Sequence, residues 1–242
     1  MKRLFPFAFG LFFTACVSPY SISKMKPLAT ETTWIWGREF ASQTIDGVTV
    51  KVAFENNDYN TGVFNVEVVN NSDQEVLISP EKFQVQISGR ELPKHFVRLQ
   101  PARDPESYFL KLEKQVAQQQ ADETNTAILH ATSLVTEAAV NVASLAIKET
   151  PEEKDQRHAI QDEADYNRQV DNYNLEVNRL NLNDQKQYYY NTLLRKTTLP
   201  PNSVMSGQVH FPRHPKASQF EIIIPVNDQI LKFPFSHSLV KP

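Results

Sequence analysis

Apolar and polar residues alternate along much of the chain, which is the spacing expected of strands that bury one face. The alternation begins at Trp34, is clear in residues 48–54, 64–68 and 83–87, and returns after residue 208. Turn-forming Asn, Asp and Gly residues separate these runs. Several short strands at this spacing predict a β-sandwich.

The spacing becomes that of a helix near residue 103 and keeps this period for about 90 residues. No glycine occurs from residue 90 to residue 206. Pro105 and Pro151 follow Asp104 and Thr150, two good N-capping residues, so each proline falls at a first helical position, where its missing N–H is tolerated. We therefore predict two helices, which begin at these prolines.

Both predicted helices carry a row of apolar or small residues at alternating steps of three and four, the spacing of a coiled-coil contact. We expect the two rows to face each other in an antiparallel pair. The link at residues 148–150 is short and lacks glycine, so a single kinked rod is the alternative. The rows are Ile128, Ala131, Val135, Ala138, Val142 and Leu145 in the first helix, and Tyr166, Val170, Tyr173, Val177 and Leu180 in the second.

Two stretches that flank the helical region share a pattern of turns and buried positions. They read FNVEVVNNSDQEVLISPEKFQVQISGRELP from residue 64 and LPPNSVMSGQVHFP from residue 199. The pattern is similar to an immunoglobulin-like (telokin-like) module of bacterial lipoproteins and secreted proteins, over about residues 45–97 and 197–236. This resemblance implies a β-sandwich and no catalytic residues.

The strand and helix patterns combine into one fold prediction. We expect an α+β chain whose immunoglobulin-like β-sandwich comprises residues 33–102 and 196–242. A long antiparallel α-helical hairpin, residues 103–195, is inserted between its strands. The strands after the hairpin should then complete the sheets begun before it.

The beginning of the sequence has the pattern of a processing signal. Lys2 and Arg3 precede an apolar run, residues 4–13, which is too short to span a bilayer. Residues 13–16 read FTAC, which resembles the lipobox of bacterial lipoproteins: an apolar residue, two small residues and the cysteine that is lipidated.

The lipobox resemblance implies that residues 1–15 are a signal peptide and that Cys16 becomes the lipid anchor. Cys16 is the only cysteine in the 242 residues, so no intrachain disulfide is expected. Residues 16–32 lack apolar periodicity and are predicted to form a flexible tether. Val17, and not Asp, follows the anchor; by the sorting rule of diderm bacteria this favours the outer membrane, facing the periplasm or the cell surface.

Acidic side chains are concentrated in the predicted hairpin. Residues 103–195 hold 10 basic and 16 acidic side chains, a net charge of −6. The whole chain has 25 and 28, a net charge of −3, which becomes −5 when the two basic residues of the signal peptide are removed. This balance gives no strongly basic face, so nucleic acid is not expected as a partner.

Residues 127–147 carry a single formal charge, that of Glu137. Their apolar residues exceed what one row in a two-helix hairpin needs, and the surplus comprises Leu129, Leu134, Val140 and Ile147. We interpret the surplus as a contact for a second copy or for another envelope protein. Packing against the sandwich and insertion into a membrane are the alternatives. The leading function is thus a non-enzymatic, membrane-tethered envelope lipoprotein whose arm mediates self-association or docking.

A ligand-binding lipoprotein is the competing function. A small molecule, peptide or glycan would bind near the base of the arm, with Trp36, His95, Tyr188, Tyr189 and Tyr190 as candidate lining residues. The sequence contains no nucleophile elbow, phosphate loop or paired-carboxylate motif. We therefore expect neither an enzyme nor a cofactor.

His210 and His214 have the spacing closest to that of a metal site. They lie four residues apart, but Pro212 and Pro215 exclude the helix that would bring them together as ligands. Strand alternation also places His210 on the outer face of its strand. We expect no metal site here.

Overall fold

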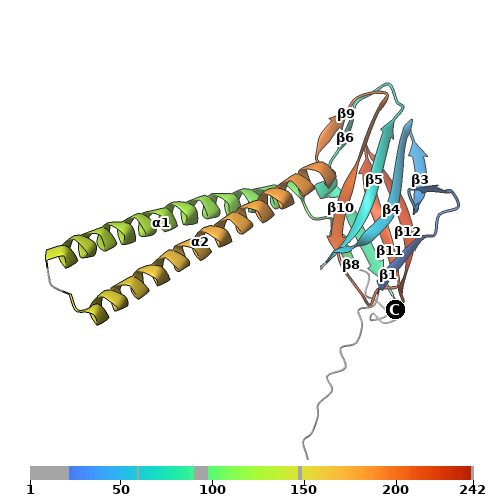
Figure 1. Cartoon of the computed structure of the whole chain (residues 1–242). Helices are drawn as coiled ribbons and strands as arrows, with labels where there is room; N and C mark the ends of the chain where they lie inside the picture. The colour runs from blue at the N-terminus through green and yellow to red at the C-terminus, as the bar shows by residue number, and fades with distance from the viewer. Residues whose placement is uncertain (1–21, 59, 90–97, 147–148, 241–242) are drawn as a thin grey trace, which may run out of the picture.

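The structure is a computed structural model that describes residues 22–58, 60–89, 98–146 and 149–240. The chain is α+β: a body of two five-stranded antiparallel sheets and a two-stranded sheet, with two long helices that project from the body as an arm (Figure 1). Cys16, His95 and Ile147 lie outside the described residues.

The first sheet has the strand order β1-β12-β11-β7-β8. Its strands are β1 Ile22–Pro27, β12 Gln229–Val240, β11 Gln219–Val226, β7 Gln84–Ser88 and β8 Arg98–Pro101. The second sheet has the order β10-β5-β4-β3-β2. Its strands are β10 Ser203–Pro212, β5 Thr61–Asn70, β4 Val48–Asp58, β3 Arg38–Ile45 and β2 Thr32–Ile35. β6 Val76–Ile78 pairs with β9 Thr197–Leu199, and a short 3₁₀ helix, η1 Pro80–Lys82, follows β6.

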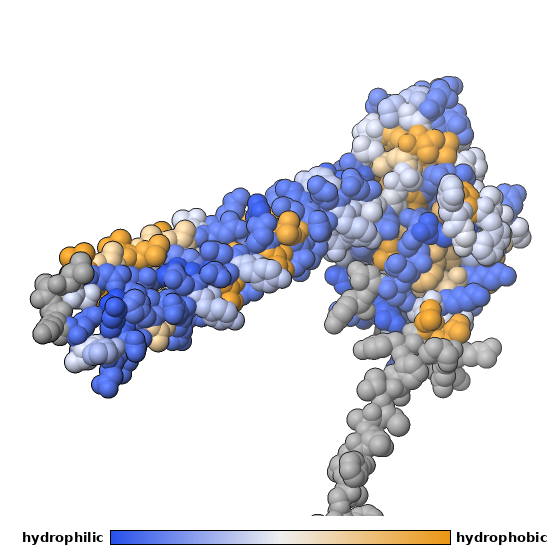
Figure 2. Space-filling view, viewed as in Figure 1, coloured by the Kyte–Doolittle hydropathy of each residue, from blue (hydrophilic) through white to orange (hydrophobic). Residues whose placement is uncertain are grey.

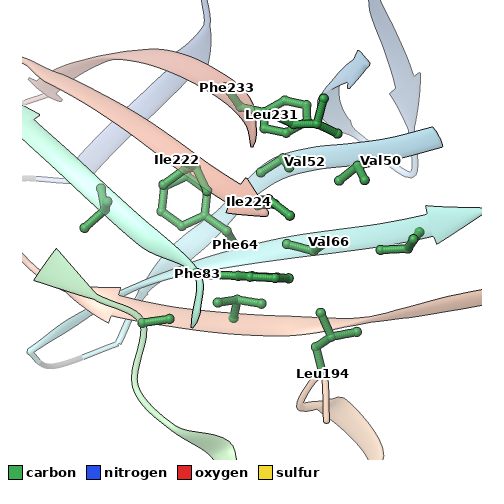
Figure 3. Packing of buried hydrophobic residues seen from close by; sticks show 14 of the residues in the cluster. Val50, Val52, Phe64, Val66, Phe83, Leu194, Ile222, Ile224, Leu231 and Phe233 are labelled. Carbon is green, nitrogen blue, oxygen red and sulfur yellow. The ribbon is translucent and has the colours of Figure 1, made fainter. Parts of the chain in front are cut away.

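The core lies between the two large sheets, because alternate residues of each strand point inward (Figure 3). Val50 and Val52 of β4 and Ile222 of β11 are fully buried. Phe64 is central: its ring meets those of Phe211 and Phe235 edge to face, with centroids 5.7 and 5.4 Å apart. Residues from both sheets therefore share one apolar core.

The arm consists of α1 Pro105–Ala146 and α2 Pro151–Thr192, each of 42 residues. Both helices begin at the predicted prolines. The Thr150 hydroxyl accepts a hydrogen bond from the Glu153 amide at 3.3 Å, and the Glu153 carboxylate accepts from the Thr150 amide at 2.9 Å. This capping box starts a second, separate helix that returns beside the first, so the arm is a hairpin and not a kinked rod (Figure 1).

The arm is inserted between β8 and β9, and strands on its two sides build the same sheets. β10 pairs with β5, β11 with β7 and β9 with β6. The body is thus discontinuous in sequence but continuous in space. At 1.5 Å per residue, each helix of the arm is about 63 Å long.

The prediction of a flexible tether that reaches residue 32 is wrong for residues 22–27. These residues form β1, which pairs with β12 from Ile22 opposite Val240 to Pro27 opposite Phe235. The inward positions of β1 are Ser23, Met25 and Pro27. Because these residues are not the β-branched or aromatic types typical of strands, the alternation was not recognisable in the sequence.

Candidate functional site

The contact between the distal parts of α1 and α2 is polar. Along α1, the half-buried positions that follow the row of steps of three and four are Glu123, Thr126, His130, Ser133 and Glu137. On α2, the corresponding half-buried positions are Arg157, Gln161, Ala164, Arg168 and Leu175. The helices are therefore held together in this region chiefly by hydrogen bonds and ion pairs.

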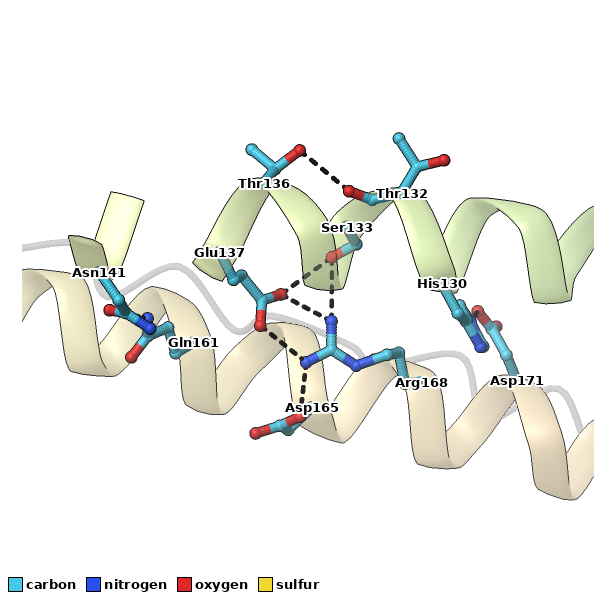
Figure 4. A network of polar contacts seen from close by, with 10 residues as sticks. All are labelled: His130, Thr132, Ser133, Thr136, Glu137, Asn141, Gln161, Asp165, Arg168 and Asp171. Carbon is cyan, nitrogen blue, oxygen red and sulfur yellow. Dashed lines mark hydrogen bonds and ion pairs between the residues drawn. The ribbon is translucent and has the colours of Figure 1, made fainter. Parts of the chain in front are cut away.

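Arg168 is the centre of this contact (Figure 4). Its Nη1 donates to Glu137 Oε1 at 2.6 Å and to Ser133 Oγ at 2.9 Å, and its Nη2 donates to Glu137 Oε2 at 3.2 Å and to Asp165 Oδ1 at 2.5 Å. Hydrogen bonds from Arg168, and then from Ser133, hold the pKa of Glu137 below its ordinary value. Hydrogen bonds to Glu137, and then to Asp165, raise the pKa of Arg168.

Further polar contacts continue the interface toward both ends of the arm. His130 Nε2 lies 3.3 Å from Asp171 Oδ2. Nearer the tip, Arg157 and Gln161 each donate to the Asn141 side-chain oxygen at 2.8 Å. The hairpin is thus fixed by specific pairs of polar side chains, which are directional and set its register.

Most described residues of the two apolar rows predicted to face each other instead face solvent, and Val177 is half-buried, so this part of the sequence interpretation is wrong. Ile128, Val135 and Val142 of α1 are 59, 70 and 68 % exposed, and Tyr166 and Tyr173 of α2 are 65 and 70 % exposed. Each helix carries a second, polar row at the same spacing on its opposite side. Spacing alone cannot choose between two such rows, and the polar rows contain the partners that pair across the hairpin.

The surplus apolar residues also lie at the surface. Leu129, Leu134 and Val140 are 67, 52 and 47 % exposed. We name the apolar face of α1 the exposed set formed by Ile128, Leu129, Leu134, Val135, Val140 and Val142, with Ala127, Ala131, Ala138, Ala139 and Ala143 between them. Figure 2 shows this apolar stretch along distal α1, beside a largely hydrophilic α2.

The apolar face of α1 carries no charge. Between Glu123 and Lys148 the only formal charge is Glu137, and its carboxylate is directed at Arg168 of α2. A groove of about 450 Å³ near the tip adjoins this face and is lined in part by Val140 and by Ile160 of α2. The sequence analysis missed Ile160, which carries no signal beyond an isolated apolar residue in an acidic helix.

The arm is rooted on β10 by aromatic contacts. His210 lies on the face of β10 opposite the core residues Val209 and Phe211, as the alternation predicts, but it is only 3 % exposed. Tyr108 of α1 and Tyr189 of α2 cover it, with ring centroids 5.7 and 6.4 Å from the imidazole. The tertiary packing of the arm thus buries a strand face that alternation marks as exposed.

A second cluster at the root of the arm contains Phe109, Tyr190 and Arg195. The Arg195 guanidinium lies over the rings of Phe109 and Tyr190, 4.6 and 5.4 Å from their centroids. It also donates to the Glu106 carboxylate at 2.9 and 2.7 Å. Hydrogen bonding to Glu106 raises the pKa of Arg195.

Of the residues proposed to line a ligand cleft, the four that the structure describes are not brought together. Tyr188 and Tyr190, 51 and 44 % exposed, lie with Tyr189 at the root of the arm next to β10. Trp36 lies in the turn between β2 and β3, at the opposite edge of that sheet, three to four strand spacings or about 14–19 Å away. Trp36 therefore cannot share a small-molecule site with the three tyrosines.

The comparisons with known proteins give no family for this chain. No family model, no curated protein and no solved structure matches it. Within the described residues, no group of three His, Cys, Asp or Glu side chains is placed to hold a metal ion. In the same part of the chain, neither helix combines the length and the apolar character needed to cross a membrane.

Proposed function

We propose that this chain is a non-enzymatic, lipid-anchored protein of the cell envelope whose helical arm associates with the arm of a second copy. The observation that carries the proposal is the uncharged apolar face of α1, which stays exposed in the single chain. A monomeric protein seldom leaves a contiguous patch of large apolar side chains in water. Fully burying one such side chain is worth roughly 1.5–3 kcal/mol.

The charge distribution favours a second copy as the occupant. Residues 103–195, which include the arm, have a net charge of −6, so two arms that met through their acidic surfaces would repel each other. The apolar face of α1 is the part of the arm where no such repulsion arises. An uncharged apolar surface is complementary to itself and selects no oppositely charged partner.

The spacing of the face also suits two copies related by a twofold axis. Ile128 and Val142 each lie seven residues from Val135. In an antiparallel pair of α1 helices centred on Val135, Ile128 of each copy would contact Val142 of the other. Such isologous contact, in which one patch meets itself, is the commonest arrangement of homodimers.

The remaining parts of the proposal concern the body and the membrane. The two face-to-face sheets and the turn pattern of the flanking stretches support assignment of the body to the immunoglobulin-like class. The FTAC sequence at residues 13–16 supports acylation at Cys16 and an address in the envelope, at the outer membrane of a diderm source. The anchor would confine the chains to two dimensions and so raise their effective concentration for a weak contact.

Sedimentation equilibrium of the full chain, with Cys16→Ser to prevent acylation, tests self-association. We expect concentration-dependent dimerisation that Val135→Lys/Val142→Lys abolishes, because lysines would be brought together at the centre of the contact. Gln115→Lys, at an exposed position on the proximal part of the same helix, is the matched control and should leave the dimer intact.

A monomer at every concentration would refute the dimer. If crosslinking through the same face in cells then captured a different protein, the face would be a heterologous contact and the proposed partner would be wrong. Equal loss of the dimer in Gln115→Lys would show that charge in general, and not the apolar face, controls association.

A further inference from the structure

We propose that Trp34 and Trp36 form a membrane-contact rim, which places its two indole rings in the interfacial layer of the bilayer that holds the lipid anchor. This inference rests on the proposed anchor at Cys16 but not on the arm. It concerns the edge of the body formed by β1 and by the β2–β3 turn.

The turn between β2 and β3 holds the indoles away from the body. Ile35 pairs with Arg38, which leaves Trp36 and Gly37 as the two turn residues, with φ of 50° and 77°. A positive φ at a bulky residue is uncommon, because the side chain crowds the backbone. Trp36 nevertheless occupies this position with 92 % of its surface exposed, and Trp34 is 69 % exposed.

Among the residues that the structure describes, none covers this turn. A methyl group added to Gly37 would meet no atom within 4 Å, so the tip projects freely from the surface. Tryptophan is otherwise a residue that buries large area, and it is enriched at membrane interfaces because its ring is apolar while its N–H remains wet. Two exposed tryptophans at this edge therefore suit a surface that buries the apolar rings and leaves their N–H groups in contact with water.

Charged side chains, three cationic and two anionic, adjoin Trp34. A hollow of about 420 Å³ between β1 and the turn is lined by Trp34 and by charged side chains of both signs. The cations are Lys24, Lys26 and Arg38, and the carboxylates are Glu39 and Glu55. Arg38 is paired with Glu55, whereas neither lysine has an ion-pair partner among the described residues. Lysine ammonium groups next to tryptophan suit the phosphates of lipid headgroups.

The length of chain between the anchor and β1 brings this edge to the bilayer. Because β1 begins at Ile22, six residue steps separate it from Cys16, and these span at most about 20 Å. The tether predicted from sequence, with sixteen steps, would reach about 55 Å. β1 and the β2–β3 hairpin lie on the side of the body away from the arm (Figure 1). The short connection therefore holds this edge near the headgroups and directs the arm away from them.

The small size of the rim argues against a protein as its occupant. A stable protein interface buries about 1,000 Å² or more in total, and two indoles with a few lysine stems provide far less. A bilayer requires no such area, because the anchor already keeps the rim beside it.

Intrinsic fluorescence tests the proposal directly, since Trp34 and Trp36 are the only two tryptophans in the chain. The first measurement uses the full chain with Cys16→Ser and vesicles of phosphatidylcholine and phosphatidylglycerol. We expect a blue shift of emission, protection from acrylamide and quenching by brominated lipid. Lys24→Gln and Lys26→Gln should each weaken binding to these vesicles about fivefold.

The second measurement uses the acylated chain reconstituted in vesicles of the same composition. Quenching of its tryptophans by brominated lipid supports the rim, and Trp34→Phe and Trp36→Phe show which indole is responsible. Anchored protein whose emission stays that of exposed tryptophan and is not quenched would overturn the rim while leaving the anchor intact. Absence of acyl groups by mass spectrometry would overturn the anchor instead, and the unacylated chain would then decide the rim alone.

Discussion

Gly207 offers a test of how the arm is joined to the body. It lies on β10 where the chain leaving α2 crosses the strand, and Leu194 donates its amide to the Gln208 carbonyl at 2.9 Å. A Cβ at Gly207 would lie 2.6 Å from the Leu194 nitrogen and 2.7 Å from its Cα. These are backbone atoms, so a flexible side chain cannot relieve the clash. The close approach explains why glycine occupies this position in the LPPNSVMSGQVHFP stretch.

The magnitude follows from the displacement required. To restore ordinary contact, the crossing segment must move by about 0.8 Å, which strains the Leu194 hydrogen bond and the end of α2. Overpacking of this kind typically costs 1–3 kcal/mol, and we expect about 3 kcal/mol for Gly207→Ala because the atoms it meets are backbone atoms of Leu193 and Leu194. With a urea m-value of about 2 kcal/mol/M, the unfolding midpoint would fall by about 1.5 M.

Urea unfolding followed by far-ultraviolet circular dichroism measures this change, and amide exchange at Leu194 shows whether the root loosens first. Gly62→Ala is the matched control, since Gly62 lies on the neighbouring strand β5 and an added Cβ would meet its nearest atoms at 3.6 Å, an ordinary contact. We expect it to change stability by less than about 0.5 kcal/mol. Equal effects of the two substitutions would refute the account of the crossing.

Three other substitutions test the polar contacts of the arm and the body. Acidification below the ordinary carboxyl pKa of about 4.5 should weaken the hairpin, because the pKa of Glu137 is lower in the folded state than in the unfolded state. The stability that the ionised Glu137 contributes is lost as the pH falls through its folded-state pKa. The thermal melting temperature of Glu137→Gln should lack this part of the pH dependence. Arg195→Lys should lower the free energy of unfolding by only about 0.5 kcal/mol, since the side chain is 41 % exposed and its ion pair is screened, and denaturant titration would contradict this if the loss exceeded about 2 kcal/mol. Asn70→Ala should cost about 2–3 kcal/mol, because the fully buried Asn70 amide donates to the carbonyls of Gln74, Leu199 and Pro200, and an unchanged midpoint in the same titration would disprove that role.

Local chemistry made the larger elements predictable. Val48, Val50 and Val52 alternate in the sequence and are all fully buried, because one face of β4 meets the core. Thr150 and Pro151 mark the start of a helix by capping and by a fixed φ, and neither effect depends on distant residues. Fold class and helix boundaries follow from interactions of this local kind.

Tertiary contacts decided the features that the sequence analysis missed. His210 is buried only because Tyr108 of α1 and Tyr189 of α2 pack over it. Met25 belongs to a strand only because β12 is there to pair with it. Which face of each arm helix turns toward the other depends on pairs of polar residues that are distant in the sequence, such as Arg168 with Glu137. The candidate contact residues Leu129, Leu134 and Val140 are exposed, and most of the row predicted to hold the hairpin together is exposed with them.

The equal lengths of α1 and α2 have a consequence for how this architecture can vary. The chain departs and re-enters the body at one place, where Glu106 and Arg195 are 2.7 Å apart. Matched insertions or deletions in the two helices, made in whole heptads, would lengthen or shorten the projection and leave every strand pairing untouched. The length of the arm, and with it the distance from the body at which its partner is bound, can therefore change without affecting the stability of the β-sheet body.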